Sequence, residues 1–286
     1  LAITEHNTTS HHRLLGAFHT TDFLPIAGQE VTSYLGHANV WGAAHWIDFR
    51  ARSDADLARI IQWAHGAGGL ISANHPKVNG PPWAFGTFAG LDCLEVWGGP
   101  WFLSNYQSLA VWDGLLRSGQ RIVGVGGSDE HQPAAADGPL YSRIGRPTTW
   151  VYAPALEAGA ILGAIQAGHV AISAGPQGPQ LTCKAQAGVA HAMMGDSLAV
   201  AAGDRVRIGG SVRGAEGLDL RLVGAEGLLA LVPISSDEFA YEHTLVAECS
   251  TYVRVEVAAP IAPEDAHEPA ALMVQALGNP VYIQVN

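Results

Sequence analysis

Apolar and polar residues follow two alternating patterns over the first 175 residues of this chain. Short runs rich in β-branched residues predict buried strands at 1–4, 24–33, 36–42, 69–75, 91–99, 122–127 and 147–153. Between some of these runs, apolar residues recur every three to four positions, which predicts helices at 54–66, 104–118 and 155–167. Ser53 is the expected N-cap of the first helix, and Ser104 with Gln107 is expected to form a capping box on the second.

The pattern changes at about Gly175. Short alternating runs at 205–212, 219–224, 228–234, 251–257 and 281–285 are separated by turn residues, which predicts a small antiparallel sandwich. Alternating strands and helices before that point predict a parallel sheet or barrel, whose active site lies at the carboxyl ends of the strands. We therefore expect one domain at 1–175 and a β-sandwich-like domain at 176–286.

Composition narrows the classes of function. The net charge is −11, and the lysines are Lys77 and Lys184 alone, so we expect no nucleic-acid partner. No apolar run reaches about 18 residues, so we expect no transmembrane helix and no membrane partner. The expected partner is a small-molecule substrate, and no residue pattern assigns a compartment. The three cysteines form no CxxC pair and are expected to be small buried hydrophobes.

Potential metal ligands recur at or near the ends of the predicted strands. Asp129 and His131 stand two positions apart after an apolar strand, so an extended backbone points both to one side. A single His or Glu of this kind is ordinarily a hydrogen-bonded loop residue. Several at successive strand ends predict a shared divalent-metal site. The predicted ligands are His6, Glu30, His37, His75, Asp129 and His131.

The same residues carry a resemblance to a known family. TEHNT, NHP and GSDEH look like motifs of the PHP (polymerase and histidinol phosphatase) superfamily, in the same order. GQEVTSYLGHANVWG, LEVWGGPW, RIGRPTTWVYA and the closing GNPVYIQV resemble its carbaryl-hydrolase-like branch of metallohydrolases. The resemblance extends over nearly the whole chain, including the β-rich tail.

This resemblance implies a fold and a chemistry. The fold would be α/β, a distorted (β/α)7 barrel followed by the small all-β domain. The site would hold one to three divalent ions (Zn, Mn or Fe), with Glu30 bridging two of them and His6 serving the outermost. A metal-held hydroxide would cleave a phosphoester, or a carbamate or carboxyl ester, and the sequence leaves that choice open. Glu30, Asp129 and His131 are the expected catalytic residues.

One family motif is missing. An HxH on the first strand should precede Leu1, and the adjacent His11 and His12 do not replace it. We therefore expect the first βα unit to lie outside this sequence, or one metal position to be degraded. The alternative function is a non-catalytic relic of the family that binds a metal or ligand. A third alternative is that the sandwich binds a partner or sugar while the first domain supports it.

Residues around these motifs bear on the substrate. Arg146 and Lys77 are predicted to bind an anionic substrate group, with Arg50 as a weaker candidate. Five tryptophans crowd the same loops and could line a pocket for an aromatic group, although core packing is the expected role of most. They are Trp41, Trp46, Trp83, Trp97 and Trp101.

Overall fold

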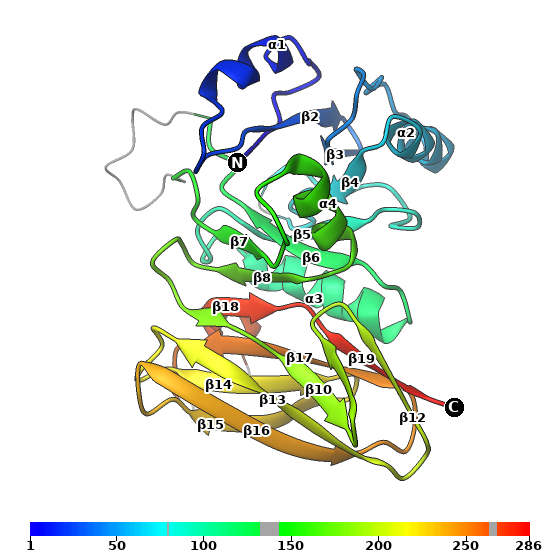
Figure 1. The fold of residues 1–286 in the computed structure, drawn as a ribbon. Helices are drawn as coiled ribbons and strands as arrows, with labels where there is room; N and C mark the ends of the chain where they lie inside the picture. Colours follow the sequence, from blue (N-terminus) through cyan, green and yellow to red (C-terminus); the bar gives the residue numbers. More distant parts are fainter. Residues whose placement is uncertain (79, 132–142, 263–267) are drawn as a thin grey trace.

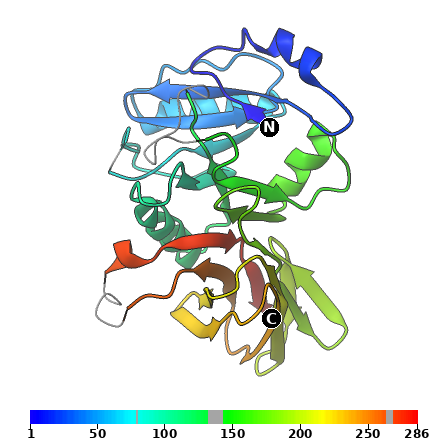
Figure 2. The same ribbon diagram turned by 90° about the vertical axis from the view of Figure 1, so that its left-hand side faces the viewer.

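The computed structural model describes residues 1–78, 80–131, 143–262 and 268–286, and its strands fall into three sheets. One sheet forms the upper half of the molecule in Figure 1, together with the helices. The other two form the lower half, where the C-terminus lies, and the last two strands of the larger one, at 148–151 and 170–173, reach up to the middle of the molecule. In both Figure 1 and Figure 2, helix α3 (Asn105–Arg117) lies at the junction between the halves.

The upper sheet has six strands in sequence order. They are β1 (Ala2–Ile3), β2 (Ile26–Ser33), β3 (Gly36–Trp41), β4 (Leu70–Ala73), β5 (Cys93–Gly98) and β6 (Val123–Gly127). The β1–β2, β4–β5 and β5–β6 pairs are parallel, whereas β3 runs antiparallel to both β2 and β4.

The predicted (β/α)7 barrel is wrong. Within the described ranges, β1 and β6 are the outer strands of an open sheet and do not pair with each other. Only Tyr34 and Leu35 connect β2 to β3, which is enough for a hairpin, whereas a parallel crossover needs a dozen residues or more. The strand predicted at 147–153 leaves this sheet altogether and pairs in the lower half.

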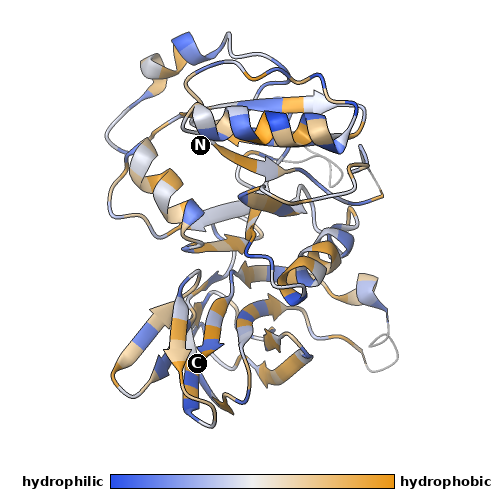
Figure 3. Ribbon diagram, turned by 90° about the vertical axis from the view of Figure 1, so that its right-hand side faces the viewer, coloured by the Kyte–Doolittle hydropathy of each residue, from blue (hydrophilic) through white to orange (hydrophobic). Residues whose placement is uncertain are grey.

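The three predicted helices form at the predicted places, with α3 at the junction and the other two in the upper half. Helix α2 (Asp54–Gly66) begins as expected, because the Ser53 hydroxyl accepts the Asp56 N–H at 3.2 Å. Figure 3, which faces α2, shows hydrophilic and hydrophobic residues alternating along it, and its buried face packs on the core. Helix α4 spans Ala158–Gln166, and a short α1 (His12–Leu15) continues into a 3-10 turn at Gly16–Phe18.

The capping box predicted for α3 does not form. Ser104 has left-handed backbone angles (φ 60°, ψ 28°), and its side chain does not cap the helix. The Gln107 side chain instead accepts the backbone N–H of Val78 at 2.9 Å. The predicted helix is therefore correct, but a loop contact takes the place of its predicted cap.

The lower half contains two sheets packed face to face around one apolar core. The five-stranded sheet contains β9 (Gln180–Leu181), β10 (Lys184–Ala187), β11 (Ala190–Met193), β13 (Arg205–Arg213) and β16 (Glu238–Val246). The eight-stranded sheet contains β7 (Thr148–Val151), β8 (Val170–Ser173), β12 (Ser197–Val200), β14 (Asp219–Gly224), β15 (Gly227–Pro233), β17 (Thr251–Ala258), β18 (Val274–Gly278) and β19 (Val281–Val285). A 3-10 turn at Pro269–Ala271 precedes β18.

The eight-stranded sheet spans the position of the predicted domain boundary. β8 lies before residue 175 in the chain, yet it pairs antiparallel with β18 close to the C-terminus. The Asn279 side chain accepts the N–H of Gly124 in β6 and donates to the same residue's carbonyl, both at 2.8 Å. The two halves are therefore joined by hydrogen bonds from the Asn279 side chain to the β6 backbone as well as by side-chain packing.

A buried ion network joins α3 to β17. Arg254, which is 1 % exposed, donates to Asp113 of α3 at 2.8 and 2.9 Å and to Glu256 at 2.5 Å. Glu256 also accepts from Arg221 at 3.0 Å. Because each buried charge has a partner of opposite sign, the junction between the halves tolerates them.

None of the described helices is both long enough and apolar enough to cross a membrane.

Replacing Asp113 by Ala should lower the free energy of unfolding by roughly 3 kcal/mol, because the buried Arg254 guanidinium loses its partner across the junction. Urea denaturation followed by tryptophan fluorescence measures this change. Glu238→Ala is the matched control, since it breaks an exposed pair with Arg213 (3.0 Å) and should cost at most about 1 kcal/mol. Equal losses in the two variants would show that the buried network does not stabilise the junction.

Candidate metal centre

The six predicted ligands gather where strands of the upper sheet begin or end. His6 follows β1 and forms a parallel bridge with Glu30 of β2. His37 is the second residue of β3 and lies opposite Thr32 in the β2–β3 hairpin. His75 follows β4, while Asp129 and His131 follow β6. The expected placement at carboxyl ends thus holds for four of the ligands, whereas Glu30 lies within its strand and His37 at the start of one.

Four imidazoles form a chain across this end of the sheet. The ring centroids of His131 and His6 are 5.2 Å apart, those of His6 and His37 are 5.8 Å apart, and those of His37 and His75 are 5.3 Å apart. Neighbouring rings at such distances can share one ion or hold adjacent ions.

Glu30 provides the negative charge of the cluster. Its side chain is buried, and its Oε1 lies 2.8 Å from His37 Nδ1 and 3.7 Å from His6 Nδ1. Burial opposes ionisation, but the His37 hydrogen bond and the nearby histidine charges outweigh it and lower the pKa of Glu30. His6, Glu30 and His37 each offer a ligand atom within 4.8 Å of the other two.

Hydrogen-bond partners assign the free nitrogens of two histidines. A carboxylate can only accept, so the His37 Nδ1 that lies 2.8 Å from Glu30 carries a proton, and Nε2 is the candidate ligand atom of that ring. His131 Nδ1 likewise faces the Asp129 carbonyl at 2.9 Å, a contact that raises the pKa of His131. The Nε2 of His131 is then the candidate ligand atom of that ring, and it lies 2.9 Å from His6 Nε2.

His75 has an unsatisfied nitrogen. The residue is 5 % exposed, and its buried Nδ1 has no hydrogen-bond partner among the described residues. Burial lowers the pKa of His75 although Asp129 and Glu30 oppose the shift, so the ring is neutral at pH 7 and has a lone pair to offer. Imidazole nitrogens together with carboxylates are the ligands that zinc, manganese and iron take. The residues present therefore fit a divalent metal.

The side chains of Asn7 and Trp46 hold the backbone next to His6 in place. Asn7 accepts the backbone N–H of Thr32 at 2.8 Å and donates to its carbonyl at 3.1 Å, so the segment after β1 stays beside β2. Trp46 donates its indole N–H to the Asn7 carbonyl at 2.9 Å while remaining 45 % exposed. An exposed aromatic ring is therefore anchored one residue from His6.

The two predicted anion-binding residues lie in different surroundings. Lys77 is buried, and its ammonium group donates to the Gly98 carbonyl at 3.1 Å and to the Asn105 amide oxygen at 3.0 Å. Arg146 is exposed and forms no ion pair with another described residue. Arg50 is bound to Asp48 through contacts of 2.6 and 2.8 Å. Of these three cations, Arg146 alone has its charge open to an incoming anion.

Sequence reasoning missed a buried carboxyl group beneath the site. Glu95 of β5 is 5 % exposed and accepts the backbone N–H of His75 at 2.8 Å. Burial and then the Asp129 charge raise the pKa of Glu95 to about 8, against the opposing effects of the His75 N–H and Lys77. A charged residue inside the apolar run CLEVWG was the available signal, because such a run otherwise predicts a wholly apolar strand.

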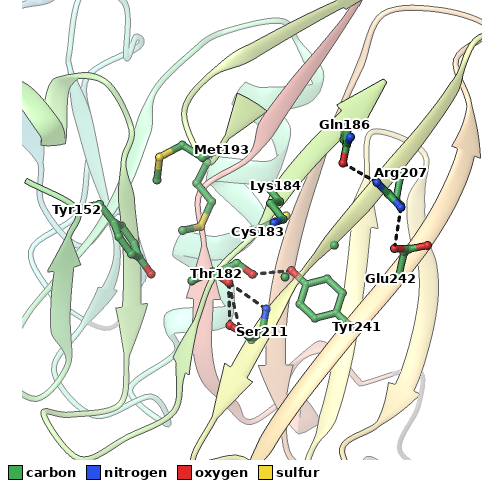
Figure 4. A pocket seen from close by; sticks show the side chains of 13 residues that line it. Tyr152, Thr182, Cys183, Lys184, Gln186, Met193, Arg207, Ser211, Tyr241 and Glu242 are labelled. Atoms are coloured by element: carbon green, nitrogen blue, oxygen red, sulfur yellow. Dashed lines mark hydrogen bonds and ion pairs between the residues drawn. The ribbon is translucent and has the colours of Figure 1, made fainter. Parts of the chain in front are cut away.

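A hollow of about 670 Å³ lies in the lower half, away from the histidine cluster (Figure 4). The hydroxyls of Tyr152 and Tyr241 in its lining donate to backbone carbonyls, and Arg207 contacts Gln186 and Glu242. Burial raises the pKa of the Cys183 thiol to about 11, so the thiol is protonated at neutral pH and a poor nucleophile. The histidine cluster is therefore the better candidate for a reactive site.

Comparisons with known proteins leave the family open. No protein-family model and no curated protein matches this chain. Among solved structures, the chain is similar to the CARDB domain of a Pyrococcus furiosus protein, determined by NMR in solution. The two share 10 % sequence identity with a TM-score of 0.23, over 38 % of this chain and 97 % of that domain.

Proposed function

We propose that this chain is a metal-dependent hydrolase of ester bonds, with one to three Zn, Mn or Fe ions held at the histidine cluster. One observation carries the proposal: four imidazoles line up beside the buried Glu30 carboxylate, and the buried Nδ1 of His75 has no hydrogen-bond partner among the described residues. The motif resemblance to the PHP superfamily supports the same chemistry, although the barrel expected of that family is not the fold.

The proposed ligands are His6, Glu30, His37, His75, Asp129 and His131. A divalent ion bound there would supply Lewis acidity, which activates water near neutral pH and stabilises negative charge on the attacked centre. Glu30 holds His37 in one tautomer, and the Asp129 carbonyl does the same for His131. The Asp129 carboxylate, 43 % exposed, is the group of the cluster best placed to take a proton from an attacking water.

The surroundings favour an uncharged aryl ester or carbamate over a phosphomonoester. A phosphomonoester carries close to two negative charges at neutral pH and needs cations besides the metals. Lys77 already donates to Gly98 and Asn105, and Arg50 already pairs with Asp48. Arg146 is therefore the remaining cation that could bind a phosphate group. Trp97 and Trp101 are core residues, Trp41 and Trp83 are partly buried, and the exposed Trp46 ring offers an apolar platform near His6.

His37→Ala should weaken zinc binding by at least about 10-fold, because it removes a ligand and leaves the Glu30 carboxylate without its closest partner. Calorimetric titration and metal analysis of the purified protein measure this. His65→Ala is the control, since His65 pairs with Asp92 at 3.0 Å away from the cluster. A wild-type protein that binds neither Zn nor Mn would contradict the proposed site.

Asp129→Asn should lower kcat/KM on a responsive ester substrate by at least about 100-fold while the melting temperature stays close to wild type. Asp196→Asn is the matched control, because Asp196 is similarly exposed and pairs with His169 at 2.9 Å in the lower half. Full activity of Asp129→Asn would place the reaction elsewhere. Metal binding with no turnover of any substrate would favour the non-catalytic alternative.

A side-by-side panel of p-nitrophenyl phosphate, bis-p-nitrophenyl phosphate and a p-nitrophenyl carbamate tests the substrate class. We expect slow diester hydrolysis, better turnover of the carbamate, and a KM for the carbamate that Trp46→Ala raises about 5- to 10-fold by removing one aromatic contact. Trp63→Ala is the control, since Trp63 is similarly exposed on α2. Strong preference for the monoester, lost on Arg146→Ala, would reverse this ranking.

A further inference from the structure

Left-handed backbone angles cluster at the proposed metal centre. Among the described non-glycine residues, positive φ angles occur at Asn7 (55°), His75 (31°), Ser104 (60°) and Asp129 (50°). Asn and Asp adopt the left-handed region readily at φ of about +50 to +70°, whereas the φ of His75 lies below that range. His75 therefore has a conformation that its surroundings must impose.

Glu95 is the residue that holds the His75 backbone. Its Oε2 accepts the His75 N–H at 2.8 Å, in a position where neither group reaches solvent. Two glycines enclose the carboxyl group, because a Cβ built on Gly98 or on Gly127 would lie 3.1 Å from it. The glycines thus leave room for the carboxyl group, and its bond to the His75 N–H fixes where the chain turns after β4.

Lys77 binds the other end of the same turn, residues 75–77, to β5. Its backbone N–H donates to the His75 carbonyl at 2.7 Å, and its ammonium group donates to the Gly98 carbonyl and to Asn105. The segment 75–77 is therefore tied to β5 at both ends. The imidazole of His75 meanwhile projects towards His37, with its buried Nδ1 unsatisfied.

We propose that Glu95 is a positioning residue of the metal centre: it holds His75 in its left-handed conformation and so presents the imidazole to the metal. This inference rests on the proposed function. Glu95 acts here through one backbone hydrogen bond, which a neutral amide oxygen of the same shape can also accept. Asp129 and His131, which follow β6, do not depend on that bond.

The test compares Glu95→Ala with Glu95→Gln. Glu95→Ala should weaken zinc affinity by about 10- to 100-fold and change the visible absorption spectrum of bound Co²⁺, because the His75 ligand loses its support. Glu95→Gln should restore affinity to within about threefold of wild type, since its amide oxygen can still accept the His75 N–H. Calorimetry, the Co²⁺ spectrum and the melting temperature of the metal-free protein are recorded for each variant.

Asp92→Ala is the matched control. Asp92 stands just before β5 and accepts the N–H of Ile71 in β4 at 2.8 Å, so it ties the same two strands together at the opposite end. It should lower the melting temperature and leave the zinc affinity and Co²⁺ spectrum unchanged. Equal zinc affinity in Glu95→Ala, Asp92→Ala and wild type would overturn the proposal, and so would a Glu95→Gln variant as impaired as Glu95→Ala.

If Glu95→Ala does not fold, Gly127→Ala replaces it as the test variant. The added methyl would crowd Glu95 Oε1 and displace the carboxyl group without removing it. Weakened zinc binding relative to Gly114→Ala, where a Cβ meets nothing within 4 Å, supports the proposal, and unchanged binding overturns it. A wild-type protein that binds no metal would instead overturn the proposed function itself, before any variant is compared.

Discussion

The buried carboxylate of Glu30 is the constraint on which the upper half depends. A carboxylate that is 4 % exposed is expensive to ionise unless opposite charge or hydrogen-bond donors surround it. Here the donors are imidazoles, delivered by the β1–β2 bridge and by the β2–β3 hairpin. His37 faces Glu30 because the two-residue turn at Tyr34 and Leu35 fixes the hairpin register, and a slip of one residue would turn His37 to the other face.

The lower half stabilises the strand that carries Asp129 and His131. Three of the five residues of β6 are glycines, and glycine inside a strand makes that strand less stable. Asn279 secures the Gly124 backbone from the lower half, and Thr149 of β7 hydrogen-bonds both the N–H and the carbonyl of Gly126. The glycines allow this close approach, since a Cβ on Gly126 would lie 2.8 Å from Ile172. The sandwich therefore acts as a support for one side of the site.

Local patterns in the sequence predicted the helices and strands better than the way the strands are connected and paired. Helix α2 and its Ser53 cap follow from spacing and residue type alone. The barrel prediction failed because a barrel of parallel strands needs a crossover between 24–33 and 36–42, and two residues cannot form one. The capping box failed because Gln107 found a loop N–H instead. Such contacts join residues far apart in the chain, so the periodicity of the sequence does not predict them.

The same limit explains which site residues were found. His6, His75, Asp129 and His131 were visible because each follows an apolar run, and strand ends in one sheet meet in space. Glu95 lies inside such a run, where its carboxyl group is the one departure from a pattern that otherwise predicts packing. Its role depends on the His75 N–H, a group that every residue but proline possesses and that no sequence motif can mark. The left-handed angle at His75 makes that N–H available, because the chain leaves the sheet there and the backbone donor has no partner in a neighbouring strand.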